Sequence, residues 1–394
     1  MQSRPLRVTA YTLCSAAGEG RAATLAALRE RRSGLVRNDF GPTPIPTWIG
    51  RVPGLEQQPL PEQFAPWDCR NNRLAWRGLL ADGFMQAAEA ARERYGADRV
   101  AVVVGTSTSS IGASEEAYTR LDAGGRYPAD LRRPIIHTPH SLGDFVQHAL
   151  GLTGISVTVA TACSSSAKVF AQAERLIRTG MADAAVVGGA DSLCGSVLFG
   201  FNSLELVSSE PCRPFDVERR GINLGEAAGF ALLEKQAVRG PWLLGCGESN
   251  DAHHMSTPHP EGVGARRALA DALKRAELRP EHIDYINLHG TASQKNDEVE
   301  AKVVADTFPV STFASSTKGW TGHTLGAAGI VEAAISLLAL DHGVLPGTLN
   351  AQALDPACGP QIQRDNAERK IRCAMSFSFG FGGSNCVLVF GADR

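Results

Sequence analysis

The sequence predicts an α/β protein whose β-sheets are covered by helices on both faces. Short apolar segments of strand length alternate along the chain with longer segments that have the periodicity of amphipathic helices. Several of the strand segments are apolar at nearly every position, as expected when both faces of a sheet are buried. No low-complexity segment or long linker divides the 394 residues.

The apolar runs locate the expected strands at residues 99–105, 155–160, 184–190, 229–234, 283–288 and 386–390. The amphipathic segments locate the expected helices at residues 21–31, 73–95, 164–179, 265–276, 298–308 and 326–340. An Arg-Gly-Pro turn at residues 239–241 suggests an N-terminal half, residues 1–238, and a C-terminal half, residues 239–394. Each half ends in a similar apolar strand, which hints at an internal duplication.

Composition narrows the function classes. The formal net charge is -2, so the protein has no global attraction to nucleic acid or to an anionic membrane. The N-terminal residues lack the apolar core of a signal peptide, and no apolar run approaches a membrane span, so we expect a cytoplasmic protein. Nine cysteines without any Cys-x-x-Cys spacing indicate reduced thiols, and we expect no metal site.

Cys163 lies where an apolar strand turns into a helix, in the segment Thr-Ala-Cys-Ser-Ser-Ser. The positive end of a helix dipole favours a thiolate, so we expect the pKa of this thiol to fall from about 8.5 toward neutrality. The helix N–H groups also suit an oxyanion on an attached thioester. The segment therefore predicts an acyl-carrying nucleophile, with a buried packing cysteine as the alternative.

Two histidines occupy comparable corners. His289 follows the strand at residues 283–288, and His323 precedes the helix at residues 326–340. Residues at the carboxyl ends of parallel strands gather in one crevice, so both rings are expected to meet Cys163. Two N–H donors would stabilise the negative charge that decarboxylation places on a thioester oxygen. The alternative is that each is an ordinary loop histidine.

Two further segments carry candidate residues. Lys318 lies five residues before His323 and is either a solvated lysine or the partner of a carboxylate, Asp297 or Glu300. Residues 375–385 read Met-Ser-Phe-Ser-Phe-Gly-Phe-Gly-Gly-Ser-Asn, a loop that allows a close backbone approach to a ligand. We interpret this loop as a backbone donor beside a mobile aromatic ring, with a plain turn as the alternative.

Taken together, Thr-Ala-Cys-Ser-Ser, His-Gly-Thr and Lys-x-x-x-Gly-His-x-x-Gly-Ala-Ala-Gly, in this order, resemble the motifs of the elongating β-ketoacyl-acyl-carrier-protein synthases. The resemblance covers nearly the whole chain. It implies a thiolase fold, in which two βαβαβαββ halves stack as a five-layered α-β-α-β-α sandwich. It also implies one compact unit of two intimate halves, usually a homodimer, rather than separate domains.

The resemblance implies a 3-oxoacyl-[acyl-carrier-protein] synthase of fatty acid biosynthesis. Cys163 would take an acyl chain from the carrier protein, and His289 and His323 would promote decarboxylation of malonyl-carrier. The carbanion then attacks the Cys163 thioester. The resemblance assigns supporting roles to Lys318 acting through Asp297 and Glu300, to Thr291 and Ser293 as phosphopantetheine ligands, to Phe381 as gate and oxyanion donor, and to Glu332 as a buried acid.

No dissociable cofactor is implied, because phosphopantetheine arrives on the carrier protein. Arg70, Arg73 and Arg77 form a basic cluster in the region where the family docks its acidic carrier, with solvated helix arginines as the alternative.

Two stretches depart from the housekeeping pattern, at residues 292–297 and 221–228. They resemble a divergent branch that includes ketosynthases of aryl-polyene-type pigment clusters. The alternative function is therefore a specialised polyketide ketosynthase, as a homodimer or as the catalytic half of a heterodimer with a chain-length-factor-like paralogue. A thiolase lacks support because the C-terminal loop carries phenylalanines instead of a second cysteine. The two histidines argue against a Cys-His-Asn initiating synthase, and the presence of Cys163 argues against a non-catalytic partner.

Overall fold

One pattern of five strands occurs twice in this computed structural model, which describes residues 5–393. The N-terminal set contains β1 (Leu6–Ser15), β5 (Val100–Gly105), β6 (Ser156–Val159), β7 (Ala184–Asp191) and β9 (Ala227–Glu234). The C-terminal set contains β10 (Trp242–Asn250), β11 (Tyr285–Asn287), β12 (Phe313–Ser315), β15 (Cys373–Gly380) and β16 (Ser384–Gly391).

The two sets have the same topology. Their spatial orders are β1-β9-β7-β5-β6 and β10-β16-β15-β11-β12, so in each set the first strand pairs with the fifth and the fifth with the fourth. These pairings are antiparallel in both sets, and the two remaining pairings are parallel in both. This repeat is the duplication at which the sequence hinted.

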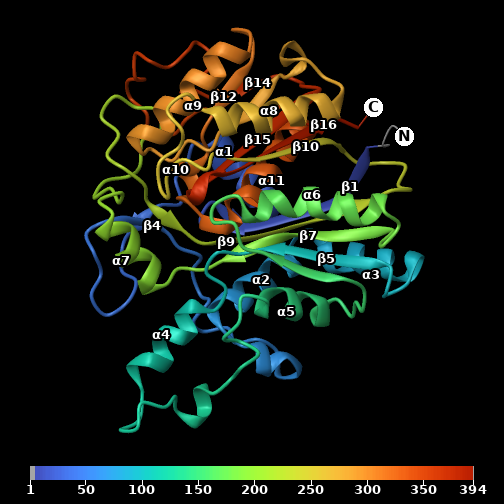
Figure 1. Cartoon of the computed structure of the whole chain (residues 1–394), viewed down its shortest axis with the longest axis vertical. Helices are drawn as coiled ribbons and strands as arrows, with labels where there is room; N and C mark the ends of the chain where they lie inside the picture. The colour runs from blue at the N-terminus through green and yellow to red at the C-terminus, as the bar shows by residue number, and fades with distance from the viewer. Residues whose placement is uncertain (1–4, 394) are drawn as a thin grey trace.

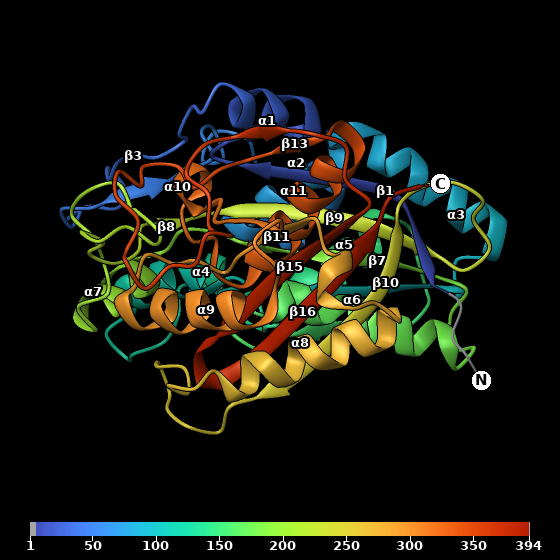
Figure 2. The same ribbon diagram turned by 90° about the horizontal axis from the view of Figure 1, so that it is seen from above.

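The helices lie in three layers around these strands (Figures 1 and 2). The central layer is α6 (Ser165–Arg178) with α11 (Ala328–His342), whose apolar side chains share one core with both sets of strands. Helices α2 (Arg70–Leu80), α3 (Phe84–Tyr95) and α5 (Ser141–Ala149) cover the outer face of the N-terminal set. Helices α8 (Val263–Ala276) and α9 (Gln294–Thr307) cover the outer face of the C-terminal set. The five-layered thiolase fold is confirmed.

The two sets also form one continuous sheet, because β1 and β10 pair at two positions, Leu6 with Leu243 and Arg7 with Trp242. The predicted boundary between residues 238 and 239 lies in the connection from β9 to β10 and stays a prediction. The remaining α-helices and strands are α1 (Gly20–Arg29), α4 (Ile111–Thr119), α7 (Gly195–Ser203), α10 (Lys318–Thr321), β2 (Gly18–Glu19), β3 (Val36–Arg37), β4 (Trp48–Gly50), β8 (Leu224–Gly225), β13 (Val344–Leu345) and β14 (Ala367–Glu368).

The single helix predicted at residues 73–95 is wrong. The chain breaks between α2 and α3, where Asp82 and Gly83 adopt positive φ values of 57° and 74°. The break has a structural role, since both carboxylate oxygens of Asp82 accept the backbone N–H of Arg21 at 3.0 Å, in the first turn of α1.

The segment Leu325–His342 is long and apolar enough to cross a membrane, with a mean hydropathy of 1.4 over 18 residues, although the sequence suggested no such run. Within the protein 83% of this segment is buried, and its helix α11 packs with α6 in the central layer, which explains its composition.

Candidate active site

Cys163 lies on a sharp turn that leads from β6 into α6. Ala162, immediately before it, has a φ of 51°, a strained conformation for a residue with a side chain. Hydrogen bonds within the turn hold this geometry, since Ser165 Oγ accepts the Thr161 N–H at 2.9 Å and Ser164 Oγ donates to the Thr161 carbonyl at 2.9 Å. The turn leaves Cys163 only 4% exposed.

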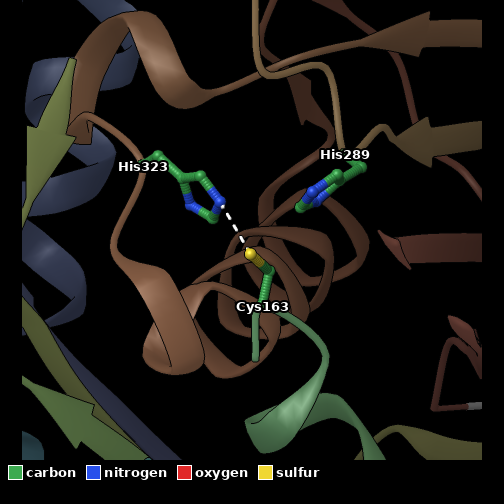
Figure 3. Close-up of side chains that lie close together, drawn as sticks. All are labelled: Cys163, His289 and His323. Atoms are coloured by element: carbon green, nitrogen blue, oxygen red, sulfur yellow. Dashed lines mark hydrogen bonds between the residues drawn. The ribbon is translucent and has the colours of Figure 1, made fainter. Parts of the chain in front are cut away.

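His323 occupies the equivalent place in the second half, in the connection from β12 to α11. Its Nε2 lies 3.1 Å from Cys163 Sγ (Figure 3). His289 follows β11, and its ring centroid lies 5.3 Å from that of His323 with the planes at 87°. The sulfur and one nitrogen of each ring all lie within 4.8 Å of one another. The structure thus brings together the three residues that the sequence selected.

Hydrogen bonding fixes which ring nitrogens carry protons. The Leu325 backbone N–H donates to His323 Nδ1 at 3.3 Å, so this nitrogen is an acceptor and a neutral ring carries its proton at Nε2. The Lys318 ammonium lies 3.5 Å from His289 Nδ1 and assigns the same tautomer there. Burial and the nearby Lys318 charge hold the pKa of both histidines well below the usual range. The two rings are therefore neutral N–H donors at physiological pH.

Lys318 is buried and forms an ion pair with Glu332 of α11, while also donating to the His289 carbonyl. Ser378 Oγ donates to the other Glu332 oxygen at 3.3 Å. Burial raises the pKa of Glu332 to about 7, although the Lys318 charge opposes the rise. The expectation that Lys318 pairs with Asp297 or Glu300 is wrong, because its ammonium reaches the central helix layer instead.

The two predicted carboxylates support the site through backbone groups. Glu300 accepts the N–H groups of His289 and Gly290, each at 2.7 Å, and so fixes the exit of β11. Asp297 accepts the Phe215 N–H at 2.8 Å. Burial raises the pKa of Glu300 to about 8 and that of Asp297 to about 6.

The protonation state of Cys163 differs from the expectation. Burial raises the pKa of the thiol to about 11, against the opposing effects of the Lys318 charge and of the nearby Phe381 backbone N–H. The predicted fall of this pKa toward neutrality is therefore wrong. Removal of the thiol from water outweighs its position near the start of α6.

A cavity of about 550 Å³ opens onto the three residues. Its walls include Thr291 and Ser293, whose hydroxyl oxygens lie 2.9 Å apart. The sequence missed two of its aromatic walls, Phe379, whose ring centroid is 6.2 Å from that of His289, and Phe201 of α7, 5.5 Å from that of Phe381. Cys163 and the two histidines are also close enough to ligate a metal ion, and the expectation that none is needed stays a prediction.

The basic cluster has internal partners. Arg70 pairs with the fully buried Glu226 at 2.6 Å, and Arg73 pairs with Asp68 at 2.6 Å. Arg77 donates to the Pro53 carbonyl at 2.6 Å. A role for these arginines in carrier docking stays a prediction. The paired carboxylates neutralise part of the positive charge that would attract an acidic carrier.

The chain is similar to proteins of known type over most of its length. Two family models match, "Beta-ketoacyl synthase, N-terminal domain" at residues 74–238 and "Beta-ketoacyl synthase, C-terminal domain" at residues 242–352. It is 34% identical to nodulation protein E of Rhizobium leguminosarum bv. trifolii, covering 86% of this chain and 87% of that protein. It is 40% identical to a mitochondrial 3-oxoacyl-[acyl-carrier-protein] synthase of Arabidopsis thaliana over 61% of this chain, and this match spans only 57% of the relative.

Among solved structures, a chain of the complex between the ketosynthase ApeO and its chain length factor ApeC from Xenorhabdus doucetiae superposes with a TM-score of 0.90. The two sequences are 34% identical and each chain is covered completely. The chain belongs to the β-ketoacyl synthase family and is a condensing acyltransferase.

Proposed function

We propose that this chain is a 3-oxoacyl-[acyl-carrier-protein] synthase that acts in the cytoplasm and lengthens an acyl chain held on Cys163. One observation carries the proposal: the Cys163 sulfur faces two buried, neutral imidazoles whose tautomers make each a hydrogen-bond donor. A site that holds two hydrogen-bond donors and a nucleophile within 4.8 Å of one another suits a reaction that builds negative charge beside a thioester.

In the first step the sulfur attacks the carbonyl carbon of an acyl chain on the carrier phosphopantetheine. The Cys163 proton is lost, the carrier sulfur leaves and takes up a proton, and a new thioester remains on Cys163. The Phe381 backbone N–H, which lowers the pKa of this thiol and so favours negative charge beside it, would stabilise the oxyanion that forms during transfer.

In the second step malonyl-carrier loses carbon dioxide, and the electron pair of the broken bond forms an enolate of the remaining thioester. The N–H groups of His289 and His323 stabilise the enolate oxygen. The carbanion attacks the Cys163 thioester carbon and expels the sulfur as a thiolate, which takes up a proton to restore the thiol. The product is a 3-oxoacyl chain two carbons longer on the carrier. No dissociable cofactor is part of this proposal, and Thr291 and Ser293, which line the cavity, would contact the phosphopantetheine arm.

A second subunit is part of the proposal. Strand β6 ends the sheet, and within residues 5–393 it pairs only with β5. All four of its residues are half-buried, and an open strand edge of this kind is a template for another chain. We infer a dimer that covers this edge. The ApeO complex with its chain length factor favours a heterodimer, and a homodimer is the competing arrangement. The mass of the purified protein, alone and co-expressed with its paralogue, distinguishes them.

The alternative pathway is specialised polyketide synthesis, favoured by the full-length similarity to a chain of the ApeO–ApeC complex, whereas the Arabidopsis relative favours fatty acid synthesis. A panel of carrier proteins bearing saturated or conjugated polyenyl chains tests both pathways, with acyl-Cys163 detected by intact mass. Selective loading of conjugated chains would support the specialised pathway. Absence of an adduct from every donor, or an adduct that persists in Cys163→Ala, would contradict the mechanism.

A further inference from the structure

Helix α7 packs apolar side chains into a small core cluster around Leu224, but its own sequence has few features that stabilise a helix. It has nine residues, Gly-Ser-Val-Leu-Phe-Gly-Phe-Asn-Ser, of which two are glycine, and its first turn has no acidic residue. Leu198 is its only buried residue, and the preceding Cys194 makes no capping hydrogen bond within the described chain. An isolated helix this short is unstable in water, so tertiary contacts must supply its stability.

Glu115 of α4 supplies the missing cap. Its two carboxylate oxygens accept the first N–H groups of α7, that of Gly195 at 3.0 Å and that of Ser196 at 2.5 Å. A carboxylate at this position also interacts favourably with the positive end of the helix dipole. The cap comes from an element about 80 residues earlier in the chain, so it connects two surface helices.

The other end of α7 reaches the active site. Phe201 lies six residues after Gly195, roughly 9 Å along the helix at 1.5 Å per residue. Its ring lies against that of Phe381 with centroids 5.5 Å apart and planes at 38°, and both rings line the cavity above Cys163. Phe381 and Cys163 both line this cavity, and the Phe381 backbone N–H opposes the rise in the pKa of Cys163.

We propose that Glu115 is a positioning residue, which caps α7 so that Phe201 holds Phe381 over Cys163. Loss of the cap frees α7 to shift, the aromatic contact loosens, and the Phe381 ring uncovers Cys163 more often. Glu115 touches no reacting atom and acts only through α7. The effect on turnover rests on the proposed acyl transfer, whereas the effect on access to Cys163 does not.

The test is the rate at which iodoacetamide alkylates Cys163, measured by peptide mass in Glu115→Gln and in Glu115→Ala. Because Cys163 is only 4% exposed, we expect both variants to react faster than the unaltered protein. The alanine variant should react about tenfold faster, which corresponds to the free energy lost when a helix loses its cap. The control is Glu116→Gln, on the same helix but exposed and paired with Arg120 at 3.4 Å, which should react as the unaltered protein does.

A double-mutant cycle with Phe201→Ala separates positioning from a general loss of stability. If Glu115 acts through Phe201, its substitution adds little once that ring is gone. We also expect kcat for acyl transfer to fall while KM changes less than twofold. Unchanged alkylation in both Glu115 variants, or full additivity with Phe201→Ala, would overturn the inference. Failure of the unaltered enzyme to form any acyl-Cys163 would overturn the proposed function and leave the alkylation result standing.

Discussion

Substitutions at the buried ion pair of Lys318 and Glu332 allow its contribution to stability to be measured separately from its contribution to catalysis. Both side chains are 3% exposed, so replacing Lys318 with Met leaves a carboxylate in the core without its cation. Breaking a buried pair on one side costs about 3–5 kcal/mol, whereas removing both charges restores most of the stability. We therefore expect Lys318→Met to be strongly destabilised. The free energy of unfolding of the double variant Lys318→Met/Glu332→Gln should lie within about 2 kcal/mol of that of the unaltered protein.

The pH dependence follows from the raised pKa of Glu332. With a native pKa of about 7 and an ordinary value of 4.5, the native state binds more protons in this range, so stability falls as pH rises from about 4.5 to 7. Without the Lys318 charge the pKa of Glu332 rises further, so the loss of stability extends to higher pH. Denaturant unfolding at pH 6 and pH 8 should show the smaller Lys318→Met penalty at pH 6.

The same double variant should not decarboxylate malonyl-carrier normally. Without the ammonium near Nδ1, the His289 proton is free to move to that nitrogen, and the ring ceases to be a donor toward the enolate. Loss of one such donor lowers the rate by roughly 10²–10³-fold. The exposed pair Lys302–Glu261, at 2.9 Å, provides the control, since Lys302→Met should cost less than about 1 kcal/mol. A well-folded double variant that decarboxylates within threefold of the unaltered enzyme would refute the assignment of the His289 tautomer.

Three other outcomes are expected. The rate of Cys163 alkylation should rise about tenfold per pH unit from pH 7 to 10, because the thiol pKa is about 11, and a plateau near pH 7 would instead support a dipole-lowered thiolate. Glu300→Gln should destabilise the protein by about 1–3 kcal/mol and slow condensation, because one of its two backbone donors loses its acceptor; thermal unfolding and product mass measure both. Gly329→Ala should lower the free energy of unfolding by about 1–3 kcal/mol, since the new Cβ would lie 2.4 Å from the Ala167 backbone nitrogen. The control Gly200→Ala, whose Cβ meets nothing within 4 Å, should leave the free energy of unfolding unchanged.

The sequence revealed features that depend on local pattern. Strand and helix periodicity located strands in both sets and the two central helices. Turns rich in small residues, at the ends of strands and starts of helices, identified Cys163, His289 and His323. These signals are local because a strand exit, a helix start and a reactive side chain are all encoded within about ten residues of one another.

Features that depend on tertiary contact were missed. The pairing of Lys318 with Glu332 joins residues 14 positions apart whose ammonium and carboxylate meet only after α11 enters the core. The raised pKa of Cys163 depends on burial by groups from several elements, which no single segment encodes. Helix α7 went unpredicted because its own sequence does not favour a helix, and its cap comes from Glu115.

The duplication explains why the site is precise. Cys163 and His323 occupy the same connection in the two halves, each leading into one of the two central helices. Those helices pack directly, with Ser166 Oγ accepting the Ile330 N–H at 2.9 Å and Gly329 seated on Ala167. The 3.1 Å separation between sulfur and imidazole is therefore set by a helix contact in the core and not by a mobile loop. A change that spreads α6 from α11 should lower acyl transfer even when no catalytic side chain is altered, because it moves the nucleophile away from its donors.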